Sequence, residues 1–350
     1  MITSSGKDEM TIPAGQAMTP DASHIRSEFD AARTRAAIVV PAPVGRIEVT
    51  GADGLDLLHR MSTNDLAAGK VGQVITTVFT TDKGRIVDYV HVAIRNSSLL
   101  LLTSPSNEAA LIRWIEKYTI MEEITLRTIT EATSTVSVIG PQAHSIVESL
   151  THQPVVAGRL LETQLASGAA LILPRSEFNT ESFDIITDAE NGAALQELLL
   201  TAGSVWGATR IGAEAYELFR IAQGIPAIGA ELSEAFNPFE AGLLHAVSFR
   251  KGCYIGQEVI ARLDTYHKVQ KQKWGLVLDG SFPAPSAGST VLAHDEPVGI
   301  LTSVAKPAVD GKRVALGILK NGTVDTDDHI AVMSEGIRVP GIVSAIPIVL

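Results

Sequence analysis

The chain has 350 residues, 45% of them hydrophobic and 19% charged, which is typical of a globular protein with two or three domains. A net charge of −11 argues against stable nucleic-acid binding, because the phosphate backbone attracts an excess of Lys and Arg. The single cysteine excludes an internal disulfide and a cysteine-rich metal site, so we expect a cytoplasmic protein without a bound metal.

The N-terminal residues 1–30 are predicted to form a flexible tail. The first 20 residues lack the basic and apolar regions of a secretory signal. No apolar run reaches the roughly 18 residues that a membrane-spanning helix needs. We therefore expect no membrane association, and we expect a monomer.

Two related α+β halves are predicted, at residues 31–135 and 136–235. The segments IEVTGADGLDLL (47–58) and VSVIGPQAHSIV (136–147) share one pattern, a short β-branched strand followed by a glycine, a polar turn and an apolar helix. In the first half, residues 74–94 predict a β-hairpin with Asp-Lys-Gly in its turn. In the second half, helices are predicted from about residue 190, with Gly203 as a C-cap, and from 211 to 223.

The character of the sequence changes at residue 274. From there to residue 350, short β-rich runs are separated by Gly, Pro, Asp and Asn, and no helical period remains. This pattern predicts an antiparallel barrel of about six strands. Residues 236–273 form a separate segment between the second half and this barrel.

That segment contains the only cysteine, Cys253, in the sequence KGCYIGQE. A helix is predicted to begin near Gly256. This helix terminus, together with Arg250 and Lys251, would favour the reactive thiolate form of Cys253. Six basic and two acidic residues lie between Arg250 and Lys273, which indicates an anion-facing surface. The alternative is a buried cysteine that packs as a small hydrophobic residue.

Residues 237–258, NPFEAGLLHAVSFRKGCYIGQE, closely resemble the signature of the YgfZ-type folate-binding proteins, which are relatives of the glycine-cleavage aminomethyltransferase (T-protein). Segments 59–90 and 217–232 resemble the same family, and the likeness extends over about residues 36–345. It implies an aminomethyltransferase-like ring of three domains around a folate pocket: two ferredoxin-like α+β halves and a C-terminal antiparallel β-barrel.

The resemblance also implies site residues for tetrahydrofolate or a derivative. Asp88 matches one member of an Asp pair in the transferases, where the second member is replaced by Tyr89, and a solvent-facing hairpin Asp is the alternative. Asp184 falls where the transferases have a pterin-recognising Glu. Cys253 and Asp88 are thus the candidate catalytic residues. The candidate cofactor-binding residues are Asp184, Tyr216, Glu217, Arg220, Glu231, Arg250 and Lys251.

Some of these candidates have structural alternatives. Glu217 and Arg220 are three residues apart on a predicted helix and could pair with each other. Tyr216 stands where the transferases have an Arg for the glutamate tail of folate. Glu231 and Glu240 follow the family pattern but also fit capping or structural roles.

Two functions follow from the resemblance. The first is a tetrahydrofolate-binding protein that supports assembly or repair of iron–sulfur clusters, with folate and iron–sulfur assembly or client proteins as partners, tRNA-modifying enzymes among the beneficiaries. The second is a folate-dependent aminomethyl or methyl transferase. The transferases have an acidic residue in place of Cys253 and a second Asp in place of Tyr89, and both departures favour the first function.

Overall fold

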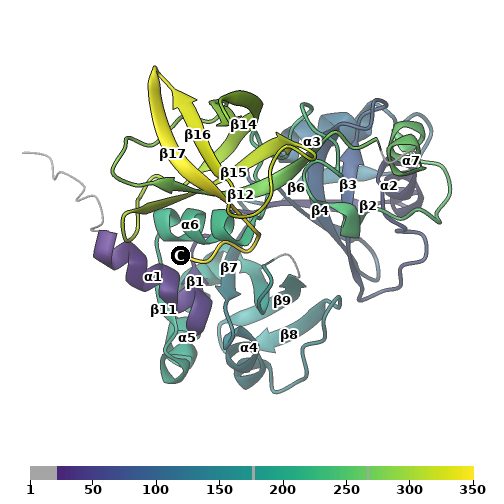
Figure 1. The fold of residues 1–350 in the computed structure, drawn as a ribbon. Helices are drawn as coiled ribbons and strands as arrows, with labels where there is room; N and C mark the ends of the chain where they lie inside the picture. The colour runs from purple at the N-terminus through teal and green to yellow at the C-terminus, as the bar shows by residue number, and fades with distance from the viewer. Residues whose placement is uncertain (1–21, 176–177, 266–267) are drawn as a thin grey trace, which may run out of the picture.

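The computed structural model describes residues 22–175, 178–265 and 268–350 (Figure 1). These residues form two β-sheets with helices and a closed barrel. Residues 22–30, expected in the tail, instead belong to helix α1 (Ala22–Thr34), because Ile25 and Phe29 are buried apolar residues on its inner face. The rest of the predicted tail, residues 1–21, lies outside the described residues. None of the described helices is long and apolar enough to cross a membrane.

The first sheet has five strands in the order β3-β4-β5-β2-β6. Its elements in chain order are β2 (Gly45–Thr50), α2 (Gly54–Met61), β3 (Val74–Thr80), β4 (Ile86–Ile94), β5 (Leu99–Thr103), α3 (Glu108–Glu116) and β6 (Thr125–Thr128). Strands β3 and β4 pair antiparallel, as predicted for the hairpin over residues 74–94.

The second sheet has six strands in the order β11-β1-β7-β10-β9-β8. Its elements are β1 (Ala37–Val39), β7 (Thr133–Ile139), α4 (Ala143–Thr151), β8 (Leu161–Leu165), β9 (Gly168–Arg175), β10 (Ser182–Asp188), α5 (Gly192–Gly203) and β11 (Thr209–Ile211), with short 3₁₀ turns η1 (Ala189–Asn191) and η2 (Ser204–Trp206). Helix α5 ends at Gly203, as expected, but its C-cap residue is Ser204. The chain continues into η2, and the residue with left-handed backbone is Gly207.

The two sheets repeat one topology, which confirms the prediction of two related halves. Strand order β3-β4-β5-β2-β6 becomes β8-β9-β10-β7-β11 in the second half, with β1 inserted between β7 and β11. Gly51 and Gly140 follow the matching strands β2 and β7 at φ +111° and +123°. A Cβ at either position would collide with main chain, at Glu123 or at Arg35. The inserted β1 means that residues 37–39, expected in the first half, complete the second sheet.

The C-terminal strands form a closed six-stranded barrel, as predicted. Its strand order is β12-β15-β14-β13-β16-β17, and β17 pairs with β12 to close it. The elements are β12 (Lys271–Asp279), β13 (Thr290–Ala293), β14 (Glu296–Val304), β15 (Lys312–Lys320), β16 (His329–Ser334) and β17 (Ile337–Ser344). Before the barrel come the turn η3 (Leu244–Ala246) and helix α7 (Gln257–Thr265).

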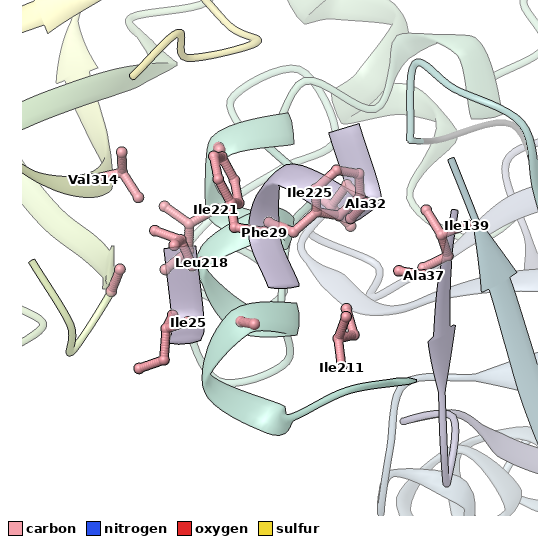
Figure 2. Close-up of a cluster of buried hydrophobic side chains, with 14 of the residues drawn as sticks. Ile25, Phe29, Ala32, Ala37, Ile139, Ile211, Leu218, Ile221, Ile225 and Val314 are labelled. Atoms are coloured by element: carbon pink, nitrogen blue, oxygen red, sulfur yellow. The ribbon is translucent and has the colours of Figure 1, made fainter. Parts of the chain in front are cut away.

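Helix α6 (Ala213–Gln223) joins the second half to the barrel. Its residues Leu218 and Ile221 pack with Ile25 and Phe29 of α1 and with Val314 of β15, as Figure 2 shows. The two halves meet through a separate apolar cluster, which includes Leu102 of β5 and Leu173 of β9. These contacts fix α6 beside the junction of the halves, where the pocket described next is found.

Candidate functional site

A pocket at the junction of the two halves, called here the central pocket, has a cavity volume of about 140 Å³. The first half contributes β4 and residues 102–105 at the end of β5, and the second half contributes Arg175 and Phe178. Helix α6 and residues 225–228 after it complete the wall. The pocket is therefore built from segments that are far apart in the sequence.

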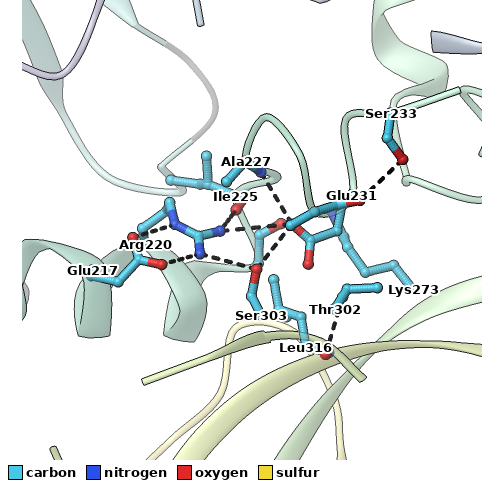
Figure 3. A network of polar contacts seen from close by, with 12 residues as sticks. Glu217, Arg220, Ile225, Ala227, Glu231, Ser233, Lys273, Thr302, Ser303 and Leu316 are labelled. Atoms are coloured by element: carbon cyan, nitrogen blue, oxygen red, sulfur yellow. Dashed lines mark hydrogen bonds and ion pairs between the residues drawn. The ribbon is translucent and has the colours of Figure 1, made fainter. Parts of the chain in front are cut away.

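Three predicted cofactor-binding residues, Tyr216, Glu217 and Arg220, line this pocket from α6. Arg220 is only 5% exposed, and its Nε donates to Glu217 at 2.8 Å (Figure 3). The other guanidinium nitrogens donate to the carbonyl of Ile225 at 2.5 Å and to the hydroxyl of Ser303 at 3.1 Å. The pairing of Glu217 with Arg220, weighed as the structural alternative, is thus present, and it places both groups on the pocket wall.

Glu231 lies behind this wall and is fully buried. Its Oε2 accepts hydrogen bonds from the amide of Ala227 at 3.1 Å and from the hydroxyl of Ser303 at 3.2 Å, and lies 3.8 Å from Nη1 of Arg220. Its Oε1 has no hydrogen-bond partner in the described part of the chain. Glu231 therefore links α6 to the barrel and does not line the pocket.

Lys273 of β12 lies beside this network (Figure 3). Its Nζ donates to the carbonyl of Gly224 at 2.6 Å, at the C-terminus of α6. Burial lowers the pKa of Lys273 to about 8, against the opposing effect of Glu231. Lys273 lines a second pocket, which shares Tyr89 with the central pocket.

Tyr89 and His91 line the central pocket from β4, and our sequence reasoning did not propose either as a site residue. The hydroxyl oxygen of Tyr89 lies 2.9 Å from Nε2 of His245, and Nδ1 of His91 lies 2.9 Å from the hydroxyl of Thr76. The usable signal was the alternation in IVDYVHVAI. Tyr89 and His91 are two residues apart on β4, so their side chains lie on one face of the strand.

Asp88 points to the other face of β4 and is fully buried, so the solvent-facing alternative is wrong. Its carboxylate accepts from the hydroxyl of Ser104 at 2.6 Å and from the amide of Tyr89 at 2.8 Å. Burial raises the pKa of Asp88. Asp88 does not line the central pocket. Its hydrogen-bond partner Ser104 does.

Asp184 shows the same indirect arrangement. It is 2% exposed, forms an ion pair with Arg175 and accepts from the hydroxyl of Ser137. Arg175 lines the pocket but Asp184 does not. Asp184 thus positions a pocket cation, whereas we had expected it to face the ligand directly.

The residues of the KGCYIGQE segment lie apart from the central pocket, whose described lining ends at Leu232. Cys253 is exposed, so the buried-cysteine alternative is wrong. Lys251 is buried, and its Nζ donates hydrogen bonds to three main-chain carbonyls of the α2 region, those of His59, Ser62 and Asn64. Lys251 therefore fastens the segment to the first half and does not face Cys253 as a free cation.

Two predicted residues remain, Arg250 and Glu240. Arg250 is exposed, and among the described residues its hydrogen bond is the one from its main-chain amide to the hydroxyl of Ser248. Glu240 accepts from the amide of Asn237 at 3.0 Å and so has a structural role. Within the described residues, no group of three His, Cys, Asp or Glu side chains could hold a metal ion.

The chain is similar in sequence to known proteins. The model of the GCVT N-terminal domain matches residues 11–251. A chloroplastic putative transferase of Arabidopsis thaliana is 32% identical over 308 residues, 87% of this chain and 69% of that protein. An aminomethyltransferase of Halalkalibacterium halodurans is 27% identical over 311 residues, 87% of this chain and 84% of the relative.

Among solved structures, the glycine cleavage system aminomethyltransferase T from Bartonella henselae matches with a TM-score of 0.77. The match covers 93% of this chain and 90% of that structure at 19% identity, and so it establishes the shared fold. The match over residues 11–251 agrees with the structural match, which includes the repeated halves and the C-terminal barrel. The chain belongs to the family defined by the GCVT N-terminal domain, as an aminomethyltransferase-like member.

Proposed function

We propose that the central pocket binds a reduced folate. The observation that carries this proposal is the composition of the wall, where flat apolar and aromatic groups meet a small set of charged ones. Tyr89, Phe178 and Tyr216 offer aromatic surface, while Glu217, Arg175 and Arg220 offer charge. A pterin needs flat apolar contacts and hydrogen-bond acceptors at its edge, and this wall provides both.

The hydrogen-bond acceptors of the wall suit a pterin. Among the described lining residues, Glu217 is the carboxylate, and its side chain is 44% exposed, so it remains accessible to the N–H donors of a pterin. The hydroxyls of Thr103 and Ser104 add neutral acceptors on the opposite wall. A bound tetrahydrofolate would supply the nitrogen atoms that carry a one-carbon unit. The role of this chain's residues is to orient that group and to exclude water.

For the biological role, we propose support of iron–sulfur cluster assembly or repair, as the resemblance of KGCYIGQE to the YgfZ-type signature implies. The supporting observation is that Cys253 is exposed on a segment fastened to the first half by Lys251. An accessible thiol at a fixed position can contact a partner protein. In this role, folate occupancy and partner contact occur at separate places on the chain.

Aminomethyl transfer to tetrahydrofolate is the second candidate, favoured by the relatives that are named aminomethyltransferases. Against it, Asp88 is enclosed and bonded to Ser104, and Tyr89 replaces the second acidic residue. The two candidates differ in one assay. Protein mixed with an aminomethylated lipoyl carrier and tetrahydrofolate should release no ammonia above background, and steady ammonia release would establish the transferase.

Folate binding itself is tested by thermal unfolding. A ligand that binds only the folded chain raises the melting temperature in proportion to the logarithm of its concentration. We expect tetrahydrofolate at about 100 times its dissociation constant to stabilise the protein by about 2.7 kcal/mol. A melting temperature that stays unchanged at every folate concentration would contradict folate binding.

A further inference from the structure

The second pocket, which Lys273 lines from β12, has a cavity volume of about 410 Å³. It adjoins the central pocket, because Tyr89, Ile225 and Pro226 belong to the walls of both. No Asp or Glu is among its described lining residues. The second pocket therefore brings a small molecule next to a lysine that the proposed folate site does not use.

The Nζ of Lys273 lies between two glycines of the second pocket, Gly224 and Gly242. It donates to the carbonyl of Gly224 at 2.6 Å, and a Cβ at Gly242 would lie only 3.3 Å from it. Within the described part of the chain, the carbonyl of Gly224 is its one hydrogen-bond acceptor. A neutral amine has two N–H groups and one lone pair. Lys273 can therefore keep this hydrogen bond through one N–H while its lone pair remains available to an electrophile.

The surroundings of Lys273 favour this neutral form. Burial lowers its pKa to about 8, with Arg220 adding to the effect and Glu231 opposing it. At pH 7, a fall from 10.5 to about 8 increases the neutral fraction of the amine roughly 300-fold. The other titratable groups on the wall of the second pocket are Tyr89 and His245, which lie 2.9 Å apart. Since the neutral amine is the nucleophile, Lys273 combines reactivity with an adjoining space.

Lys251 provides a comparison within the same chain. Burial lowers its pKa to about 8 as well. Its Nζ, however, donates to the three carbonyls of His59, Ser62 and Asn64, so all three N–H groups are used. Loss of a proton would direct the lone pair at a carbonyl oxygen. The two lysines thus resemble each other in acidity, and they differ in whether the lone pair can reach a ligand.

We propose that Lys273 is a nucleophilic amine that captures a small aldehyde as a Schiff base in the second pocket. The lone pair of the amine forms a bond to the carbonyl carbon, and a proton passes from nitrogen to oxygen. The resulting carbinolamine loses water and leaves a C=N bond. No electron is gained or lost, so the step needs no oxidant or reductant, and water reverses it. The reaction does not require folate, so this inference stands apart from the proposed folate binding.

Reductive methylation of the unmodified full chain tests this proposal. Formaldehyde is the probe aldehyde, sodium cyanoborohydride reduces the Schiff base to a stable methylamine, and peptide mass spectrometry locates the label. At pH 7, we expect Lys273 to be labelled about tenfold or more faster than both Lys251 and the exposed Lys312. The rate at Lys273 relative to that at Lys312 should fall between pH 7 and pH 10, because Lys273 is already mostly neutral above pH 8. Unfolding in urea should bring the three rates together.

Two results would overturn the proposal. Equal labelling of Lys273 and Lys312 on the folded chain would show that the amine of Lys273 is not reactive. Equal labelling of Lys273 and Lys251 would show that acidity alone decides the rate and that the second pocket gives Lys273 no advantage. Because the label is located on the unmodified chain, neither result depends on whether a Lys273 variant folds.

Discussion

The hydroxyl oxygen of Tyr89 lies 2.9 Å from Nε2 of His245, which joins β4 of the first half to the turn η3 that precedes the KGCYIGQE segment. Tyr89 is 7% exposed and lines the central pocket, whereas His245 is exposed. The bond therefore links the pocket wall to the segment that contains Cys253. The two residues are 156 positions apart in the sequence.

Tyr89→Phe should lower the free energy of unfolding by about 1 kcal/mol, because it removes one hydrogen bond while preserving the ring. Urea denaturation measures this. Tyr118→Phe is the matched control, since the Tyr118 ring packs against Trp114 in the same half and its hydroxyl has no hydrogen bond in the described structure. A double-mutant cycle with His245→Gln should give a coupling of at least 0.5 kcal/mol, and purely additive effects would contradict the bond.

Asp184→Asn should weaken folate binding although Asp184 does not line the pocket. The change removes the charge that holds Arg175 in the wall, and we expect roughly a tenfold rise in the dissociation constant, from about 1–3 kcal/mol for a lost charge-assisted contact. Glu162→Gln, which breaks the more exposed ion pair with Arg95, just after β4, is the control. An unchanged affinity for Asp184→Asn would show that Arg175 needs no such support.

Lys273 should make stability depend on pH in the alkaline range. Its ordinary pKa of 10.5 falls to about 8 in the folded chain, so the unfolded chain binds more protons between these values. Stability therefore rises with pH across this window, by up to about 3 kcal/mol from this group, and the penalty is fully present below pH 8. Glu231 and Arg220 are the charged groups that face it.

The measurement is urea denaturation of the unmodified chain and Lys273→Met from pH 7 to 10. As the pH increases, the free energy of unfolding of the unmodified chain should increase relative to that of Lys273→Met. Lys312→Met, at an exposed position on the barrel, should show no such shift. A pH-independent difference for Lys273→Met would mean that the folded chain keeps this lysine charged throughout.

Cys253→Ser should leave the free energy of unfolding within about 0.5 kcal/mol of the original, as for other exposed substitutions. The thiol of the native protein should be alkylated by iodoacetamide without unfolding. If Cys253 acts on a partner, the Ser variant should fail to restore cluster-enzyme activity in cells that lack the native protein. Full restoration would remove Cys253 from the proposed role.

Much of the fold could be predicted because its signals are local. The strand–glycine–helix repeat at Gly51 and Gly140 predicted two related halves, since both glycines adopt a backbone conformation that other residues avoid. The alternating runs after residue 274 predicted the barrel. Strand β1 was missed, because three residues have no period of their own, and only pairing with β7 and β11 defines them.

The site was harder to predict, because contacts between distant segments decide it. The positions of Tyr216, Glu217 and Arg220 on one helix correctly indicated residues that lie together. Asp88 and Asp184 were expected to face a ligand, but each is one side chain behind the wall, bonded to Ser104 and to Arg175. The sequence predicts which strand contains a carboxylate. It does not predict which neighbouring side chain that carboxylate will bond to.

We propose that a reduced folate occupies the pocket between the halves, and its occupancy is tested most directly by titration combined with a variant that fills the pocket. Ala227 is half-buried on the wall, so Ala227→Phe would add a ring to the pocket space. Ala305→Ser, a small change in the cluster between α6 and the barrel, controls for general destabilisation. Calorimetry should show one folate bound per chain for the unmodified protein and the control, and an affinity at least tenfold weaker for Ala227→Phe. Equal affinity for all three proteins would contradict the assignment of folate to this pocket.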